Sequence, residues 1–553
     1  MKSNNYIILA FALVLSLSGC DDFGDLNTDP TAATVPDAKS LISTVQTRFS
    51  GDRETVWRAN FGYHMTIMQM VSDGWTGAHG QVYLPDASYF EYLWKASYIN
   101  ANDLEIAIET AAQNEVNINY HSVARIMKVM VFAQLTDSYG DIPYSEALNA
   151  FSEGNIKPKY DAQQDIYTDF FKELTEAADQ LDSAKPLEGD LIFNGDVEKW
   201  RKFANSLRLR YALRLVNVDA ATAQTEALAA LTGGVMESYT DAAYVTHGNN
   251  DVILSSTGGV EIRGNGFSQV QHFAEQITVA CETYAGYMKA NNDPRLRMMF
   301  GIYGAESSNS ATNDKFKSVT PTSIEVTEEY LAQEGELTAY PPGYYLFDNT
   351  DAEGITWTPI KVEKNGVDVT LTKYFKSLQI NRELTALDMP SMYMSYAEVE
   401  LYKAEMAARG WGGTGVSDVA THFENAVFAS IDELENVMDS RPVSGVVSDY
   451  VDDLLATGTS RLELIAMQQY MVNFYNGTEA YANWRRTGFP VLKPADHANT
   501  DTNLNGLIPR KLPYPNTEMN FNRENLEAHL DDGVNFWGAP VWWDGSRDRG
   551  VLK

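Results

Sequence analysis

Positive charge is scarce in this sequence. Its 42 lysine and arginine residues face 75 aspartate and glutamate residues, which gives a net charge of −33. Such an acidic protein repels phosphate backbones, so nucleic acid is a poor partner. Other polyanionic ligands are disfavoured as well unless a local basic pocket receives them. Beyond these exclusions, the charge indicates solubility.

Long hydrophobic runs are also lacking, with one exception near the start. Residues 6–17 form a twelve-residue, almost wholly apolar run, and no other run reaches eighteen apolar residues. Twelve helical residues extend about 18 Å, which is too short for the roughly 30 Å hydrocarbon core of a bilayer. We therefore expect that the rest of the chain does not span a membrane.

The apolar run has the features of a secretion signal. Lys2 precedes it, and the small residues Ser18 and Gly19 lead into Cys20. A basic start, a short apolar core and a small-residue cleavage site are typical of a signal peptide. The segment Leu17-Ser18-Gly19-Cys20 resembles the lipobox of bacterial lipoproteins, which implies lipidation at Cys20. An ordinary signal and an uncleaved anchor are the alternatives. Each buried acyl methylene would contribute about 0.8 kcal/mol to membrane attachment.

Cysteine is nearly absent. The sequence contains only Cys20 and Cys281. If Cys20 carries lipid, Cys281 has no partner for an intrachain disulfide. Cys281 lies in a helical-looking run, which favours a buried, inert thiol over a reactive one.

Catalytic and cofactor-binding motifs are missing too. The sequence has no H-E-x-x-H, P-loop or G-x-S-x-G pattern, and its eight histidines show no metal-ligand spacing. Residues 501–506 match the first half of an EF-hand loop, but Leu512 replaces the glutamate at its twelfth position, so a polar turn is expected. We predict no cofactor, no metal and no enzymatic activity, although the 75 carboxylates leave a glycosidase-type acid pair open.

Changes in composition along the chain suggest five segments. We expect a lipoprotein signal peptide at 1–19 and an acidic N-terminal tether at 20–40. A helical body follows in two parts, at 41–234 and 385–553, and an irregular ligand-facing insertion lies between them at 235–384. The insertion is rich in glycine, serine, asparagine and threonine, and loops of that kind carry binding residues. Its segments 360–362 and 367–369 favour β structure.

Helical periodicity dominates both parts of the body. Between residues 161 and 183, apolar side chains recur every three or four positions, at Ile166, Phe170, Leu174, Ala177 and Leu181. Asp161 is a candidate N-cap for this helix, with Gln164 in the capping-box position. The pattern predicts a mostly α fold, with paired helices stacked in a tetratricopeptide-like solenoid, although a strict repeat is absent.

Seven motifs in order along nearly the whole chain resemble the SusD/RagB family of nutrient-binding outer-membrane lipoproteins. Each motif is weak alone, and their order carries the resemblance. They are FGDLNTDP (23–30), YGDIPY (139–144), WRKFANSLRLRYALR (200–214), DPRL (293–296), SYAEV (395–399) with the helix after it, WRRTGFP (484–490) and IPRKLPYP (508–515). The last departs from the family pattern at Lys511 to Pro513, where a second arginine and no proline would be expected.

The resemblance implies an α-helical body of tetratricopeptide-like units on the outer membrane, lipid-anchored and facing the exterior. It implies a SusC-like TonB-dependent transporter as partner. The protein would then capture an oligosaccharide or a peptide and deliver it to that transporter. A lipid-anchored glycan hydrolase and a structural lid without its own ligand site are the alternatives.

Most of the shared motifs have a structural explanation. Arginines recur among apolar residues of one helical segment, and guanidinium groups are well suited to bridging carboxylates and carbonyls between packed helices. The arginines expected to act in this way are Arg201, Arg208, Arg210, Arg214, Arg485 and Arg486. Trp94 and Tyr98 are spaced four residues apart, as on the core face of a helix.

Ligand contacts are predicted in two loop regions. Residues 72–83 hold three glycines and two large aromatics without helical periodicity, and prolines in 340–345 hold two tyrosines on a rigid turn. An exposed aromatic offers a flat apolar face to a sugar ring or a peptide side chain, although packing of these rings into the fold is the alternative. The predicted ligand-binding residues are Asp73, Trp75, Gln81, Tyr83, Arg263, Asn265, Tyr344 and Tyr345.

Overall fold

The computed structural model describes residues 37–72, 79–149, 154–248, 262–273, 278–301, 304–305, 355–356, 360–364, 367–371, 373–375, 379–381, 383–413, 415–437, 442, 444–495, 500–530 and 533–545. The chain divides into two units, Met1–Asp37 and Ala38–Lys553, and the elements below belong to the second. Of the predicted functional residues, Cys20, Asp73, Trp75, Tyr344 and Tyr345 lie outside the described residues.

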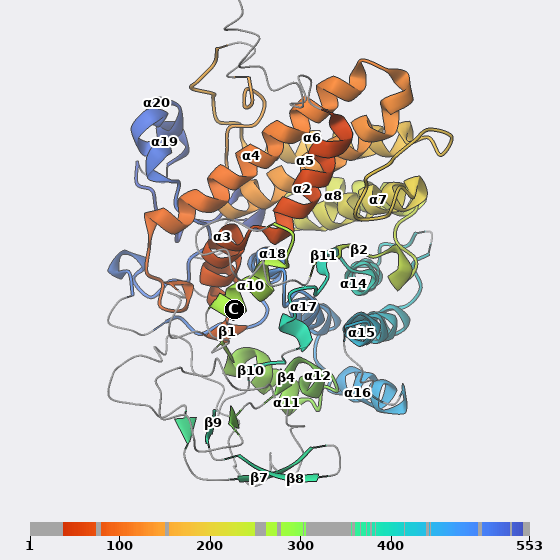
Figure 1. Ribbon diagram of the computed structural model, residues 1–553, viewed down its shortest axis with the longest axis vertical. Helices are drawn as coiled ribbons and strands as arrows, with labels where there is room; N and C mark the ends of the chain where they lie inside the picture. Colours follow the sequence, from red (N-terminus) through yellow and green to blue (C-terminus); the bar gives the residue numbers. More distant parts are fainter. Residues whose placement is uncertain are drawn as a thin grey trace, which may run out of the picture. The chain divides into compact units, whose positions relative to one another are not determined.

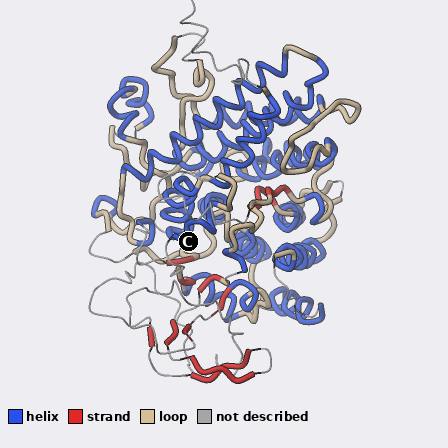
Figure 2. Tube along the Cα trace, in the orientation of Figure 1, coloured by secondary structure: helices blue, strands red, loops and turns tan. Residues whose placement is uncertain are grey.

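Helices make up most of the described chain (Figures 1 and 2). Up to residue 241 they are α2 (Ala38–Gly51), α3 (Arg53–Thr55), the π-helix η1 (Val56–Met65), η2 (His79–Gln81), α4 (Ala87–Ala112), η3 (Glu115–Asn117), α5 (Ile118–Tyr139), α6 (Gln163–Gln180), α7 (Val197–Arg214), α8 (Ala220–Gly233) and η4 (Tyr239–Asp241). Helix α4 packs on α5, α5 on α6, α6 on α7 and α7 on α8. This succession confirms the predicted mostly α fold of stacked helix pairs.

The later helices continue the same packing. They are α10 (Gly266–Phe273), η5 (Glu282–Gly286), α11 (Tyr287–Ala290), α12 (Leu296–Met299), η7 (Glu383–Thr385), α14 (Tyr396–Ala408), α15 (Val419–Glu435), α16 (Ser444–Ala456), α17 (Arg461–Val472), α18 (Gly477–Thr487), η8 (Thr502–Leu504), α19 (Asn516–Phe521), α20 (Arg523–Leu526), η9 (Glu527–His529) and η10 (Trp542–Asp544). Helix α14 packs on α15 and α17, and α18 packs on η1 and α5. The last helices of the chain therefore lie against the first.

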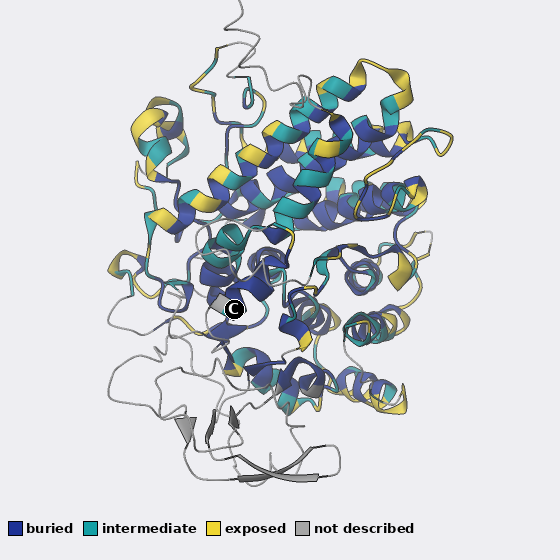
Figure 3. Ribbon diagram, viewed as in Figure 1, coloured by how far each residue is buried: buried dark blue, intermediate teal, exposed yellow. Residues whose placement is uncertain are grey.

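Helix α6 shows how the apolar pattern becomes structure. Buried residues lie along the inner sides of the packed helices (Figure 3). The predicted stripe is among them, with Ile166, Phe170 and Leu174 fully inaccessible. The predicted cap is wrong, because the N-cap position holds Ala162 and its side chain forms no capping bond. The backbone N–H of Gln163 instead donates to the carboxylate of Asp141 at 2.8 Å. The acceptor comes from the preceding loop, which a local capping pattern does not show.

Strands are few and short. An antiparallel sheet has the order β1 (Val71–Ser72), β3 (Val279–Ala280), β10 (Gln379–Ile380), β4 (Phe300–Gly301). The other strands are β2 (Ala243–Val245) paired with β11 (Ser391–Met394), β9 (Lys373–Phe375) between β5 (Gly304–Ala305) and β6 (Ile355–Thr356), and β7 (Ile360–Lys364) paired with β8 (Val367–Leu371). The β7–β8 pair confirms the predicted β segments of the insertion.

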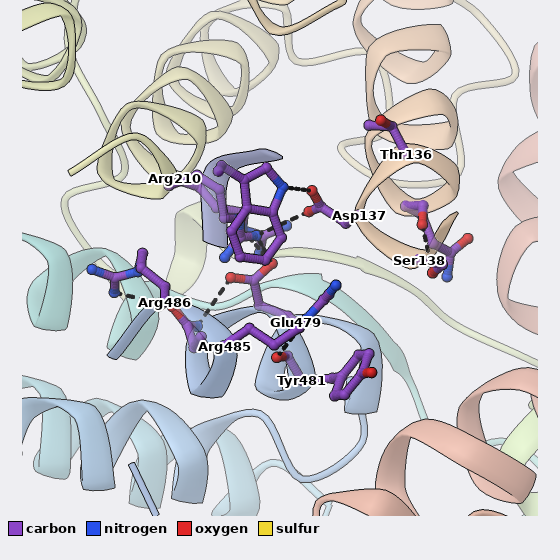
Figure 4. Close-up of polar contacts among 12 residues, drawn as sticks. Thr136, Asp137, Ser138, Arg210, Glu479, Tyr481, Arg485 and Arg486 are labelled. Carbon is purple, nitrogen blue, oxygen red and sulfur yellow. Dashed lines mark hydrogen bonds and ion pairs between the residues drawn. The ribbon is translucent and has the colours of Figure 1, made fainter. Parts of the chain in front are cut away.

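Buried arginines connect early helices to late ones (Figure 4). Arg210 of α7 donates to both carboxylate oxygens of Glu398 on α14, at 2.7 and 2.8 Å. Arg214 of α7 contacts Glu479 of α18 at 2.6 Å and Asp137 of α5 at 3.3 Å. These arginines are at most 5% exposed, so their charges are neutralised inside the protein. The predicted bridging role of arginines in this helix is confirmed.

The two consecutive arginines of α18 are buried as well. Arg486 donates two hydrogen bonds to Glu405 of α14, at 2.5 and 2.8 Å. Arg485 lies with its guanidinium carbon 4.0 Å from the centre of the Tyr481 ring and 4.7 Å from that of Trp543. Both side chains therefore hold helices together, as predicted.

Candidate ligand-binding site

The small sheet holds the start of the first region in which ligand contacts were predicted, at β1. Ser72 pairs with Val279, which pairs with Gln379, which pairs with Gly301. These four residues form one row across the strands, about 14 Å long at the usual spacing of roughly 4.8 Å. Strand β1 leads from this row towards residue 73, and β4 leads from it towards residue 302, in the opposite direction. Segments more than two hundred residues apart in sequence therefore start from one short row.

The ends of the first region are tied together. The hydroxyl of Ser72 donates to Oε1 of Gln81 at 2.6 Å, and both side chains are buried. Gln81 ends η2, which packs on η1 through Gly80. A Cβ atom at Gly80 would lie 2.5 Å from Oγ1 of Thr66 and 2.6 Å from the carbonyl oxygen of Tyr63. Only glycine allows this approach, so Gly80 fixes the position of η2 against η1.

Tyr83 supports the same turn from the interior. Its side chain is buried in the hydrophobic core, and burial raises the pKa of its hydroxyl. Its backbone has a positive φ of 52°, and its carbonyl accepts a hydrogen bond from the N–H of Asp501 at 3.1 Å. The structure thus places Gln81 and Tyr83 as supports of the turn, and their contact with a ligand stays a prediction.

Arg263 and Asn265 lie at the start of α10. Arg263 is exposed, whereas Asn265 is buried. The amide of Asn265 donates to the carbonyl of Met389 at 2.9 Å and to Oγ of Ser391 at 3.0 Å, and its oxygen accepts from the N–H of Ser268 at 2.9 Å. Helix α10 packs on α3 and η1. Arg263 and Asn265 therefore precede a helix that packs on η1, and η1 also supports the turn at Gly80.

An arginine stacked among aromatic rings lies beside this turn, and the sequence analysis missed it. The guanidinium carbon of Arg58 is 4.3 Å from the centre of the Tyr92 ring, 4.8 Å from that of Tyr89 and 4.9 Å from that of Trp57. The ring of His79 is 4.4 Å from that of Tyr89. We call these five residues the aromatic–arginine cluster. Its members come from η1, η2 and α4, so they meet only in the folded chain.

The cluster offers both apolar faces and hydrogen-bond donors. Tyr92 is 38% exposed and Trp57 is half-buried. Nη2 of Arg58 lies 3.1 Å from Oε2 of Glu54, which leaves other guanidinium N–H groups pointing elsewhere. Burial lowers the pKa of His79, Asp86 opposes this and Arg58 adds to it. Arg58 is therefore the member that carries positive charge at neutral pH. Aromatic faces beside guanidinium donors suit a neutral, hydroxyl-rich ligand.

A metal site is not present in the described residues. No group of three or more histidine, cysteine, aspartate or glutamate side chains there is placed to hold a metal ion. Asp501 instead accepts hydrogen bonds from the N–H of Asn503 and from the indole of Trp537, at 3.0 and 2.9 Å. Cys281 is buried, and burial raises the pKa of its thiol to about 12, which agrees with an inert role. Among these residues no helix is both long and apolar enough to cross a membrane.

Comparison with known proteins identifies what the chain is similar to. Residues 30–340 and 343–515 match the model of a family described as SusD-like, starch-binding and associating with the outer membrane. No curated protein matches the sequence. Among solved structures, a chitin-binding protein is 30% identical, with a TM-score of 0.74 over 92% of this chain and 100% of its own. A protein described as Bacteroidetes AC2a SusD-like is 26% identical, with a TM-score of 0.77 over the same shares. A SusD-like protein from Bacteroides thetaiotaomicron, 21% identical with a TM-score of 0.66 over 93% of this chain and 100% of its own, shares the fold.

Proposed function

This chain belongs to the SusD-like family, and on that premise we propose that it is a surface-exposed lipoprotein that captures a glycan for import. The proposal includes lipidation at Cys20, an outer-membrane location facing the exterior, and delivery to a SusC-like TonB-dependent transporter. The observation that carries the binding role is the aromatic–arginine cluster beside the turn at Gln81. Aromatic faces and guanidinium donors are gathered there on the surface of a rigid helical body.

A neutral oligosaccharide is the ligand class that fits best. The net charge of −33 disfavours anionic polymers. Sugar rings present apolar C–H faces for stacking and hydroxyls for hydrogen bonds, which match Tyr92 and Arg58. The family description names starch and one similar solved structure is a chitin-binding protein, so both polymers supply neutral test ligands.

We further propose that the loop residues of the sequence analysis complete the site. Trp75 and Asp73 belong to the segment between β1 and η2, and η2 carries His79 of the cluster. Arg263 lies just before α10, which packs on η1. Gln81 and Tyr83 would then act by shaping the turn. Tyr344 and Tyr345 belong to the region that starts from the other end of the same row.

The test is a binding screen of starch and chitin oligosaccharides by calorimetry on the mature protein. One stacking contact contributes on the order of 0.5–1.5 kcal/mol beyond its buried area, so Trp75→Ala should weaken binding at least about tenfold. Its melting temperature should stay near that of the wild type. Trp94 is the matched control, because its ring is 6% exposed and packs edge-on against Tyr139 at 5.1 Å.

Trp94→Ala should do the reverse and cost about 3–5 kcal/mol of stability. If Trp75→Ala binds normally, the loop takes no part in binding. If peptides bind and all the sugars fail, the ligand class is wrong. Release of sugar products from the same polymers would favour the hydrolase alternative. Cys20→Ala should move the protein from membranes to the soluble fraction, and retention on membranes would place the anchor elsewhere.

A further inference from the structure

A separate cavity opens on another part of the molecule. It encloses about 530 Å³ among β2, β11, α14, α15 and the chain after α17. No member of the aromatic–arginine cluster lines it. Tyr239 and Tyr244 line it and are 44% and 39% exposed, so the cavity reaches the surface there. The volume is within the range of small-molecule sites.

The walls of this cavity are thioethers and aromatic rings. Thioethers are polarisable, and the faces of aromatic rings carry partial negative charge. Such walls attract positive charge without competing for it as a carboxylate would. The side chains concerned are Met299, Met389, Met392, Met394 and Met471, with Tyr393, Phe474 and Tyr475.

Among the charged residues that line the cavity, the cations are already engaged. Arg295 lies 2.6 Å from Asp293, and the amino group of Lys199 donates to the carbonyl of Thr240 at 2.6 Å. The carboxylate of Glu398 is held by both donors of Arg210. Neither cation forms an ion pair with a further acid of the lining among the described residues.

Glu433 is that further acid. It lies on α15, and its Oε1 accepts a hydrogen bond from the N–H of Ala397 at 3.4 Å. No ion pair among the described residues includes Glu433. Withdrawal from water raises the pKa of its carboxyl to about 8, the Ala397 N–H opposes this, and the negative charge of Glu398 adds to it. Its side chain is half-buried, and an acid that is partly withdrawn from water without an ion-pair partner favours its neutral form.

One more polar group in the lining lacks a partner. The hydroxyl oxygen of Tyr475 is buried without a hydrogen bond in the described structure. Buried polar groups in folded proteins are nearly always paired, so this hydroxyl is an exception, and Tyr475 faces the cavity with other atoms of its side chain. Tyr475 is positioned by edge-on contacts with Phe267 and Phe474, whose ring centres lie 5.2 and 5.0 Å away.

We propose that this cavity binds a small organic ammonium ion, with its positive charge at Glu433 and its carbon substituents against the methionine and aromatic walls. Such a ligand supplies a counter-charge for Glu433. Attraction to the ring faces adds to the ion pair, as in other aromatic sites for ammonium groups.

The test uses choline and its neutral isostere dimethylbutanol, in which carbon replaces the ammonium nitrogen. Both have the same shape and one hydroxyl, so they differ in charge alone. Calorimetry on the full mature protein at pH 7 should show choline binding at least tenfold tighter than the isostere. Titrations in buffers of different ionisation enthalpy should show release of close to one proton per choline, because Glu433 ionises when the cation arrives.

Glu433→Gln keeps an oxygen for the Ala397 N–H and removes the charge. It should weaken choline binding at least tenfold and leave glycan binding and the melting temperature unchanged. Glu435→Gln on the same helix is the matched control, because Glu435 does not line the cavity. Choline should also bind when the protein is saturated with glycan.

Three results would overturn the proposal. Equal binding of the isostere would mean that shape alone selects the ligand, and undiminished binding to Glu433→Gln would place the ammonium elsewhere. If neither compound binds, the cavity is not a site for a small ammonium ion. If Glu433→Gln fails to fold, two measurements on the unaltered protein still test the proposal. They are the comparison of choline with its isostere and the release of a proton on choline binding.

Discussion

Arginine meets carboxylates and aromatic rings in two regions of this molecule, with opposite consequences. Between α5, α7, α14 and α18, Arg214 and Arg486 are inaccessible to water and lie against buried carboxylates. At the surface, Arg58 has a single carboxylate partner and three rings, one of them exposed. The same side chain thus stabilises the fold where its carboxylate partners are buried, and we propose that it contacts a ligand where one of its ring partners is exposed.

The largest loss of stability is expected when a buried arginine is removed. Arg214→Ala leaves Glu479 and Asp137 facing each other without the cation between them. Loss of one partner of a buried pair costs about 3–5 kcal/mol, because the remaining charge stays buried. Urea unfolding followed by circular dichroism should show this loss. A change below 1 kcal/mol would mean that the network is not a source of stability.

Acid should weaken the buried region by a predictable route. Burial works against ionisation of Glu405, but attraction and hydrogen bonds from Arg486 prevail and lower its pKa from 4.5 to about 2. A carboxyl with a lowered folded-state pKa stabilises the protein fully above its ordinary pKa and loses this contribution as pH falls through the folded value. We expect Glu405 alone to contribute roughly 3 kcal/mol, lost between about pH 4.5 and pH 2.

Unfolding free energies from urea titrations at successive pH values check this window. The pKa of Glu400 is also lowered to about 2, by His422 and Lys403 against the effect of burial, so its loss falls in the same window. A stability that stays constant down to pH 3 would contradict the assignment.

The surface region should respond in binding instead of stability. Arg58→Ala should weaken the proposed glycan binding about tenfold and cost less stability than Arg214→Ala, because its ion pair keeps some contact with water, with side chains 19% and 16% exposed. Arg53→Ala is the comparison variant, since Arg53 contacts the same carboxylate, Glu54, at 2.9 Å. Calorimetry with the cognate oligosaccharide compares the two. Equal losses in both variants would remove the cluster from the site.

The smallest effect is expected where both partners face water. Lys39 and Glu188 form an ion pair at 2.9 Å, with side chains 42% and 74% exposed. Exposed pairs of long side chains contribute little, because solvent screens them and holding them costs entropy. Lys39→Ala should leave the melting temperature unchanged within error. A clear drop would show that exposure is a poor guide to the role of a charge in this protein.

The sequence predicts the helical body well because its signals are local. The stripe from Ile166 to Ala177 is inaccessible in the structure, and the β-prone segments of the insertion pair as β7 and β8. The motif order also identifies the family, since the family model covers most of the chain. These features depend on residues a few positions apart or on their order, which can be read from the sequence.

The candidate site is harder to predict because its parts are joined by tertiary contacts. Trp57 and Arg58 sit in a π-helix, whose wider turn alters the spacing on which amphipathic patterns rest. Tyr92 and His79 reach them from other elements. Gln81 and Tyr83 have polar groups that suit a ligand, yet their burial depends on the approach of η2 to η1 at Gly80. The composition of a loop therefore predicts where a site lies in the sequence, but it does not predict which of its side chains are exposed.

The meeting of the last helices with the first has a consequence for how the protein is made. Thr478 contacts His64 across 414 residues, Tyr470 reaches the carbonyl of Met68 across 402, and Arg214 meets Glu479 across 265. Contacts so distant in sequence form only when nearly the whole chain is present. We expect a chain that stops before residue 479 to leave Arg214 without one of its two carboxylates and the early helices uncovered. Such a truncated chain should therefore be cleaved by proteases more readily than the full chain.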